Sequence, residues 1–259
     1  MRKTGGSTHR RRRRRRSGIT NRPPLYLPAK GDPDHLVCYI PPGDLNPDGM
    51  SGRIAGPRGG WVVGRDYEMC TRINDKTKGT GFAVYSPSYE ITSRWDPKQK
   101  RGVPAAWIRG VYRYATEKKK HHFLYLVGFS GGGAVASSQL VDYPDKMVQG
   151  LVVISGPVAE GGPHTSAAFY ANRINVRTLL TYGKLDGYNR AVDVWMQRAR
   201  ENKAHVDKLY YEGGHDYGQP KDSFELVTNT VIDWLKNVAR SSRPIRHRRR
   251  KRHGHTRNR

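Results

Sequence analysis

The fold is decided by residues 124–136, which read LYLVGFSGGGAVA. An apolar run of strand length leads into Gly128-Phe129-Ser130-Gly131-Gly132, and small residues suited to a tightly packed helix follow at once. A strand, a sharp turn and a helix in this order hold a serine where the amino end of the helix points at the reacting oxygen. A strained turn of this kind leaves no room for side chains on the flanking residues. The pattern therefore predicts that Ser130 is a nucleophile.

The rest of the chain alternates short apolar runs with segments of helical periodicity. We expect strands at residues 36–40, 82–85, 123–129, 148–154, 178–182 and 208–211, and helices at 65–76, 104–120, 131–141, 188–203 and 223–238. Residues 156–175 are expected to be irregular, with room for a short helix. Alternation of this kind predicts an α/β fold with a mostly parallel sheet of about six or more strands, helices on both faces and little or no cap.

Two further polar residues, Asp186 and His215, follow expected strands just as Ser130 does. Because the carboxyl ends of parallel strands meet at one edge of a sheet, we expect all three side chains to gather there. A serine hydroxyl needs a base to take its proton, and a carboxylate can orient that base and stabilise its charged form. Asp186 is also suited to capping the helix expected at 188–203, and Asp193 is a reserve acid within that helix.

In these motifs the sequence resembles the α/β-hydrolase superfamily, over residues 31–240 and most specifically from Gly128 to His215. It is most similar to the small, nearly capless carboxylesterases, thioesterases and feruloyl esterases. The resemblance implies the α/β-hydrolase fold and a catalytic triad in the chain order nucleophile, acid, histidine. It implies Ser130, Asp186 and His215 in these roles, acting on a carboxylic ester or thioester without a cofactor.

The oxyanion hole departs from the family pattern. The backbone N–H of Gly131 is the expected first donor. Many members carry His-Gly after the first core strand, whereas this chain has Pro41-Pro42-Gly43-Asp44. Proline has no N–H, so the second donor is expected from Gly43, Asp44 or Leu45. Loss of one donor costs about 10²–10³ in rate, which predicts a weaker or narrower enzyme.

The net charge of +25 comes mainly from the two ends of the chain. Residues 1–30 hold 11 of the 47 Lys and Arg and residues 241–259 hold 9, with no acidic residue in either segment. The remaining 27 bases face 22 acids, so the part between is nearly balanced. We expect residues 31–240 to form one domain and both ends to be disordered tails.

Arginine runs of this density neutralise phosphates and release counterions, so the tails predict binding to nucleic acid or another polyanion. We expect that binding to use Arg10, Arg11, Arg12, Arg13, Arg14, Arg15, Arg16, Arg248, Arg249, Arg250, Lys251 and Arg252.

Cysteine content and hydropathy exclude several classes of protein. The two cysteines, Cys38 and Cys70, fall in apolar patterns and are expected to be buried free thiols. The sequence has no complete signal peptide, no apolar stretch of membrane-span length and no metal-ligand spacing, so we expect an intracellular protein without a metal.

Two functions remain open at this point. The first is a serine hydrolase whose tails bind a polyanion. The alternative is a nucleic-acid-associated structural protein, part of a virion or ribonucleoprotein, built on a recruited hydrolase fold with weak or no catalysis. The intact order of serine, aspartate and histidine favours the first, and the arginine tails and the Pro-Pro-Gly-Asp departure favour the second.

Overall fold

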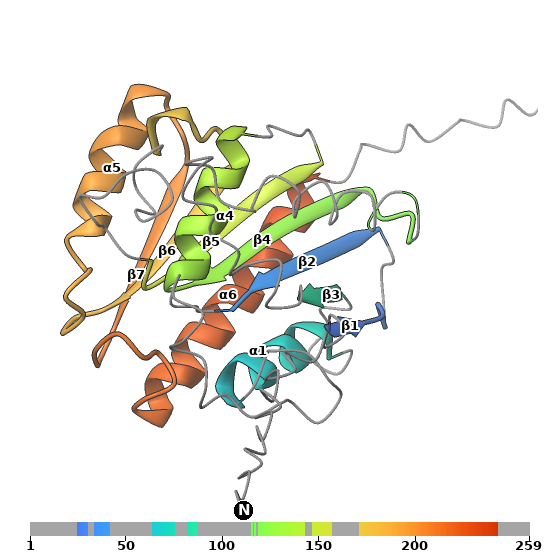
Figure 1. Cartoon of the computed structure of the whole chain (residues 1–259), viewed down its shortest axis with the longest axis horizontal. Coiled ribbons are helices and arrows are strands. Elements are labelled where there is room, and N and C mark those ends of the chain that lie inside the picture. The colour runs from blue at the N-terminus through green and yellow to red at the C-terminus, as the bar shows by residue number, and fades with distance from the viewer. Residues whose placement is uncertain are drawn as a thin grey trace, which may run out of the picture.

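The computed structural model describes residues 25–30, 34–41, 64–75, 82–86, 115, 117, 119–142, 147–156 and 171–242. These residues form a seven-stranded sheet in the order β1-β3-β2-β4-β5-β6-β7 (Figure 1). The strands are β1 (Leu25–Leu27), β2 (His35–Ile40), β3 (Ala83–Ser86), β4 (Phe123–Phe129), β5 (Val148–Ile154), β6 (Arg177–Gly183) and β7 (Val206–Tyr211).

Six of the strands are parallel, and only β1 pairs antiparallel, with β3. The central strands are apolar along nearly their whole length because both of their faces are covered. In β2 every residue is buried, and in β4 every residue after Phe123 is buried. Because the strands are parallel, the chain leaves β4, β5, β6 and β7 at one common edge of the sheet.

Helices pack on both faces of this sheet (Figure 1). They are α1 (Gly64–Asn74), α4 (Gly131–Asp142), α5 (Ala191–Glu201) and α6 (Lys221–Ser242), with a 3-10 turn, η4 (Ala171–Arg173). One core cluster joins α4 and α5 to the sheet through residues such as Ala134 and Trp195, and a second joins α1 and α6 to the opposite face through residues such as Ile73 and Leu235. The predicted mostly parallel sheet covered on both faces is confirmed.

Two elements extend past the predicted domain of residues 31–240. Leu25–Leu27 forms strand β1 inside the segment predicted to be a tail, because its two buried leucines complete the core beside β3. Helix α6 likewise continues to Ser242, past the predicted boundary at residue 240. Residues 1–24 and 243–259, the helix predicted at 104–120 apart from residues 115, 117, 119 and 120, and the loops on which the prediction of a small cap depends lie outside the described residues.

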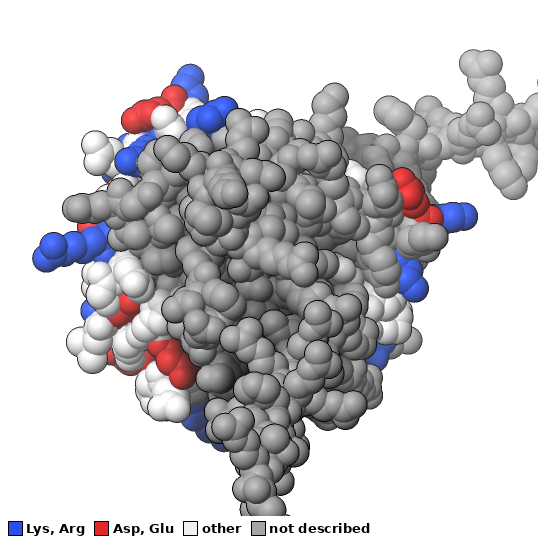
Figure 2. All heavy atoms as spheres, in the orientation of Figure 1, with Lys and Arg blue, Asp and Glu red and all other residues white. Residues whose placement is uncertain are grey.

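Cys38 and Cys70 are buried free thiols, as predicted. Of the helices that the structure describes, none is long and apolar enough to cross a membrane. On the described part of the surface in Figure 2, Lys and Arg side chains lie interspersed with Asp and Glu, as the near-balance of charge between the tails leads one to expect.

Candidate active site

Ser130 lies in a strained turn between β4 and α4. Its φ of 52° falls in the left-handed region that non-glycine residues rarely adopt. Its N–H donates to the carbonyl of Ile154 at 2.8 Å, which fixes the turn to the end of β5. A Cβ on Gly132 would approach the carbonyl oxygen of Ile40 to 2.3 Å, so only glycine fits beside the end of β2. Strain held by such close packing is typical of functional sites.

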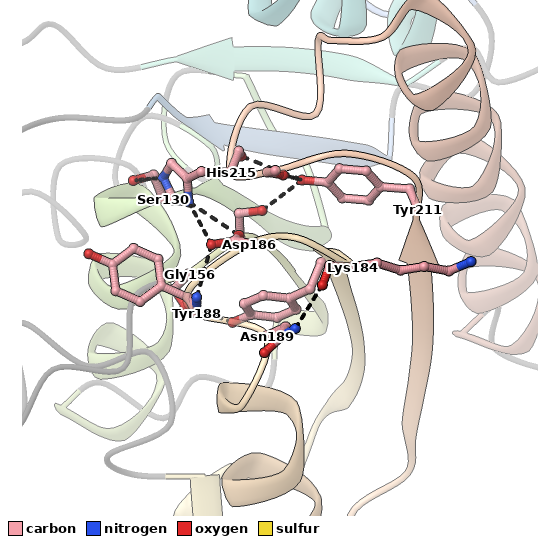
Figure 3. A network of polar contacts seen from close by, with 11 residues as sticks. Ser130, Gly156, Lys184, Asp186, Tyr188, Asn189, Tyr211 and His215 are labelled. Carbon is pink, nitrogen blue, oxygen red and sulfur yellow. Dashed lines mark hydrogen bonds and ion pairs between the residues drawn. The ribbon is translucent and has the colours of Figure 1, made fainter.

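Ser130, His215 and Asp186 lie in one hydrogen-bonded row (Figure 3). The Oγ of Ser130 is 2.8 Å from Nε2 of His215, and Nδ1 of His215 is 3.2 and 3.3 Å from the two carboxylate oxygens of Asp186. A carboxylate only accepts hydrogen bonds, so Nδ1 carries the proton and the neutral imidazole leaves Nε2 free to accept from the serine hydroxyl. This row is hereafter called the serine row.

Asp186 is buried, with 1% of its side chain exposed. Burial alone would raise the pKa of its carboxyl, but hydrogen bonds from His215, the backbone N–H of Tyr188 and the hydroxyl of Ser155 outweigh burial and lower the pKa below its ordinary value. The carboxylate is therefore ionised at neutral pH. Asp186 is not the cap of the following helix, because α5 begins after Arg190. It forms a turn with Tyr188 instead.

His215 faces solvent, with 39% of its side chain exposed. Two aromatic rings contact the imidazole. Phe129 lies tilted against it at 5.6 Å between ring centroids, and Tyr188 meets it edge-on at 5.3 Å. The rings limit the rotation of His215 while leaving its Nε2 beside the serine. The serine row thus has a buried anionic end at Asp186 and a partly exposed end at His215 and Ser130.

Of the residues predicted for the oxyanion hole and the tails, Gly131 lies within the described part of the chain and the others lie outside it. Gly131 is the first residue of α4, where backbone N–H groups have no acceptor within the helix. Pro41 lies against the turn, since a Cβ on Gly132 would also meet its carbonyl oxygen at 2.7 Å. Gly43 and Asp44 lie outside the described residues, as do the basic residues of both tails.

The reserve acid Asp193 is exposed and lies on α5. It lines an open hollow of about 380 Å³ together with Lys184, Asn189 and Tyr210, and no member of the serine row lines that hollow. Within the described ranges, no group of three His, Cys, Asp or Glu side chains is arranged to hold a metal ion.

The sequence analysis missed three residues that contact the serine row: Tyr188, Ser155 and Tyr211. Ser155 and Tyr211 are joined by a hydrogen bond of 2.8 Å between their hydroxyl oxygens. Ser155 directly follows β5 and Tyr211 ends β7, so both lie at the same sheet edge as Ser130 and Asp186. The rule that selected Asp186 and His215, position directly after a strand, could have found Ser155 as well.

Comparison with solved structures identifies the α/β-hydrolase fold. The Francisella virulence factor BioJ matches with a TM-score of 0.62 at 13% identity, over 82% of this chain and 80% of that one. Est1E from Butyrivibrio proteoclasticus matches at 0.59 and 13% identity, over 84% and 94% of the two chains. Dienelactone hydrolase from Anabaena variabilis matches at 0.55 and 16% identity, over 85% and 93%.

The match extends over most of each chain, so the whole described core shares the fold. At these identities the likeness concerns the fold alone. No family model matches the sequence, and no curated protein matches it.

Proposed function

We propose that the protein is a serine hydrolase that cleaves a carboxylic ester or thioester through an acyl-enzyme. The observation that carries the proposal is the distance of 2.8 Å between the Oγ of Ser130 and Nε2 of His215, whose other nitrogen faces the buried carboxylate of Asp186. Many serines follow a strand, but a strained serine within reach of an oriented base has the geometry of an activated nucleophile.

The chemistry follows from that geometry. Ser130 attacks the acyl carbonyl while His215 takes its proton, and the Asp186 carboxylate stabilises the imidazolium that forms. His215 then returns the proton to the leaving alcohol or thiol, and the acyl group remains on the serine. Water, deprotonated by His215, releases the acid and restores the hydroxyl. The Gly131 N–H at the start of α4 is our candidate donor to the oxyanion, with a second donor expected from Gly43 or Asp44.

Hydrolysis of a p-nitrophenyl ester series from acetate to octanoate tests this function. We expect turnover by the full chain and a loss of at least about 10³-fold in Ser130→Ala. Ser137→Ala is the matched control, because Ser137 lies in α4, the helix that follows Ser130, and its hydroxyl donates to the carbonyl of Gly133. Equal turnover by Ser130→Ala and the full chain would contradict the proposal.

We further propose that the arginine tails bind nucleic acid or another polyanion. Eleven basic residues in the first 30 and nine in the last 19, with no acid among them, support this proposal. Because β1 and α6 belong to the sheet core, the tails are best removed as residues 1–24 and 243–259.

The trimmed chain is expected to keep its ester turnover and to lose salt-sensitive binding to a labelled single-stranded oligonucleotide. Oligonucleotide binding by the trimmed chain would contradict the role of the tails. Binding by the full chain without any Ser130-dependent turnover would favour the alternative, a structural nucleic-acid-associated protein on a hydrolase fold.

A further inference from the structure

Tyr188 presents an exposed aromatic ring beside the base of the serine row. The residue is 39% exposed, and its ring meets the imidazole of His215 edge-on at 5.3 Å between centroids. Phe129 packs against the same imidazole but is only 8% exposed. Of these two rings, Tyr188 is therefore the one whose surface a bound molecule can contact.

Hydrogen bonds fix the turn that carries Tyr188. Its own N–H donates to Oδ1 of Asp186 at 2.9 Å, and the N–H of Asn189 donates to the carbonyl of Asp186 at 3.0 Å. The side chain of Asn189 donates to the carbonyl of Lys184 at 3.0 Å, which closes the turn. In the view of Figure 3 the ring extends from this turn to the side where Ser130 lies. Because the backbone of Tyr188 is already held relative to the serine row, binding against its ring costs less ordering.

The reaction places the leaving group next to His215. To return its proton, Nε2 of His215 must come within about 2.6–3.2 Å of the leaving oxygen. The same nitrogen is 2.8 Å from the Oγ of Ser130, so the leaving oxygen lies close to both groups. The atoms attached to that oxygen can then contact the ring of Tyr188, whose centre is 5.3 Å from the centre of the imidazole.

We propose that Tyr188 is a specificity-determining residue whose ring binds a flat, apolar leaving group, such as that of an aromatic alcohol. The inference rests on the hydrolase function proposed above. Aromatic rings pack against one another in offset or edge-to-face arrangements, which adds to the gain from burying apolar area. Because Tyr188 contacts the base that protonates the leaving oxygen, we assign the leaving group to this ring and not the acyl group.

The test compares kcat/KM of the full chain for phenyl acetate and trifluoroethyl acetate. Both esters acetylate the same serine, but only phenyl acetate carries a ring on its leaving group, and kcat/KM depends only on the steps up to acylation. We expect Tyr188→Ala to lower the ratio of kcat/KM for phenyl acetate to that for trifluoroethyl acetate about three- to tenfold, the size of an aromatic contact. Tyr188→Phe keeps the ring and is expected to leave the ratio within about twofold.

This ratio separates contact with the leaving group from other effects of the substitution. Loss of the ring contact with His215 lowers kcat/KM for both esters alike, and so does a loss of folded protein. Trifluoroethyl phenylacetate carries its ring on the acyl group, so Tyr188→Ala is expected to leave its kcat/KM relative to trifluoroethyl acetate unchanged. Leu185→Ala is the control, because Leu185 lies in the same turn and is 82% exposed.

Three results would overturn the role of Tyr188 while leaving the hydrolase function intact. They are an unchanged phenyl-to-trifluoroethyl ratio in Tyr188→Ala, a fall of the phenylacetate ratio in its place, and an equal fall in Leu185→Ala. A full chain without any Ser130-dependent turnover of phenyl acetate would overturn the hydrolase function and this role together.

Discussion

Within the part of the chain that the structure describes, two carboxylates, those of Asp186 and Asp66, are buried near the same sheet edge, and their surroundings differ. Asp186 and Asp66 are 3% and 8% exposed, and each is hydrogen-bonded to at least two partners. At Asp66 the donors are Tyr39 and Tyr217, which reach the same oxygen at 2.6 and 2.8 Å and are themselves buried. At Asp186 one partner is His215, which is partly exposed and whose other ring nitrogen is hydrogen-bonded to Ser130.

The comparison teaches that burial and hydrogen bonding do not by themselves make a carboxylate catalytic. Burial raises the pKa of both Tyr39 and Tyr217, and the negative charge of Asp66 raises them further, so both phenols stay protonated and keep donating. The cluster of Asp66, Tyr39 and Tyr217 connects β2, α1 and the loop after His215 by hydrogen bonds, and we expect it to stabilise the fold. Asp186 differs because its partner is an imidazole, which in the proposed reaction exchanges a proton with the substrate.

Asp186→Asn is expected to give the largest effect. The amide keeps the size of the side chain but favours the wrong tautomer of His215, so kcat should fall by about 10⁴. Steady-state hydrolysis of p-nitrophenyl acetate measures the loss, with circular dichroism to verify folding.

The matched change at the other carboxylate sharpens the comparison. Asp66→Asn is expected to leave kcat within about threefold and to lower the free energy of unfolding by about 1–3 kcal/mol, because a charged acceptor becomes a neutral one. If Asp66→Asn lowered kcat as far as Asp186→Asn, the two carboxylates would not differ in role.

Removal of the phenol hydroxyls tests the supporting role of the Asp66 cluster. Tyr39→Phe and Tyr217→Phe are each expected to lower the free energy of unfolding by about 1–3 kcal/mol, since each takes one hydrogen bond from a buried carboxylate. Urea unfolding measures the change as a lower midpoint at constant m-value. An unchanged midpoint in both variants would show that the cluster does not stabilise the fold.

A smaller effect is expected at Tyr188, whose ring meets His215 edge-on while its N–H donates to Asp186. Tyr188→Ala removes the ring and keeps the N–H. Aromatic contacts of this kind contribute about 0.5–1.5 kcal/mol, so kcat should fall by roughly two- to tenfold. Leu185→Ala is the control, because Leu185 lies in the same turn and is 82% exposed. A kcat equal to that of the control variant would exclude a role for the ring.

The smallest effect is a dependence of stability on pH. The pKa of Asp186 is lower in the folded chain than its ordinary value of 3.8, so this carboxylate stabilises the fold above that value. The contribution is lost as the pH falls through the lowered pKa. The difference in free energy of unfolding between the unmodified chain and Asp186→Asn is therefore expected to be larger at pH 6 than at pH 3. A difference independent of pH would contradict the lowered pKa.

Most of the fold could be predicted because its signals are local. The strands Phe123–Phe129 and Val148–Ile154 are predicted to the residue, since each is a continuous apolar run between turn signals. The strand β1 was missed because three residues between prolines carry no periodicity. His121, just before β4, is 4% exposed, although nothing in the pattern around it predicts burial. Burial of a single residue just before a strand depends on packing that a local pattern does not encode.

The serine row could be anticipated for a different reason. Ser130, Asp186 and His215 are far apart in the chain, but the carboxyl ends of parallel strands bring them to one edge. No comparable rule predicts the contacts of the side chains packed around the serine row. Tyr217 reaches Asp66 across 151 positions of sequence, and Tyr211 reaches Ser155 across 56. Their pairing depends on which side chains meet in the folded core, and one sequence does not specify that.

Covalent labelling with a fluorophosphonate tests the central claim most directly, because the probe reacts with an activated serine and needs no knowledge of the natural acyl substrate. We predict one adduct per chain, located on the peptide that contains Ser130, with no adduct in Ser130→Ala and normal labelling in Ser137→Ala. Absence of an adduct in the folded full chain, or an adduct that persists in Ser130→Ala, would contradict the claim that Ser130 is an activated nucleophile.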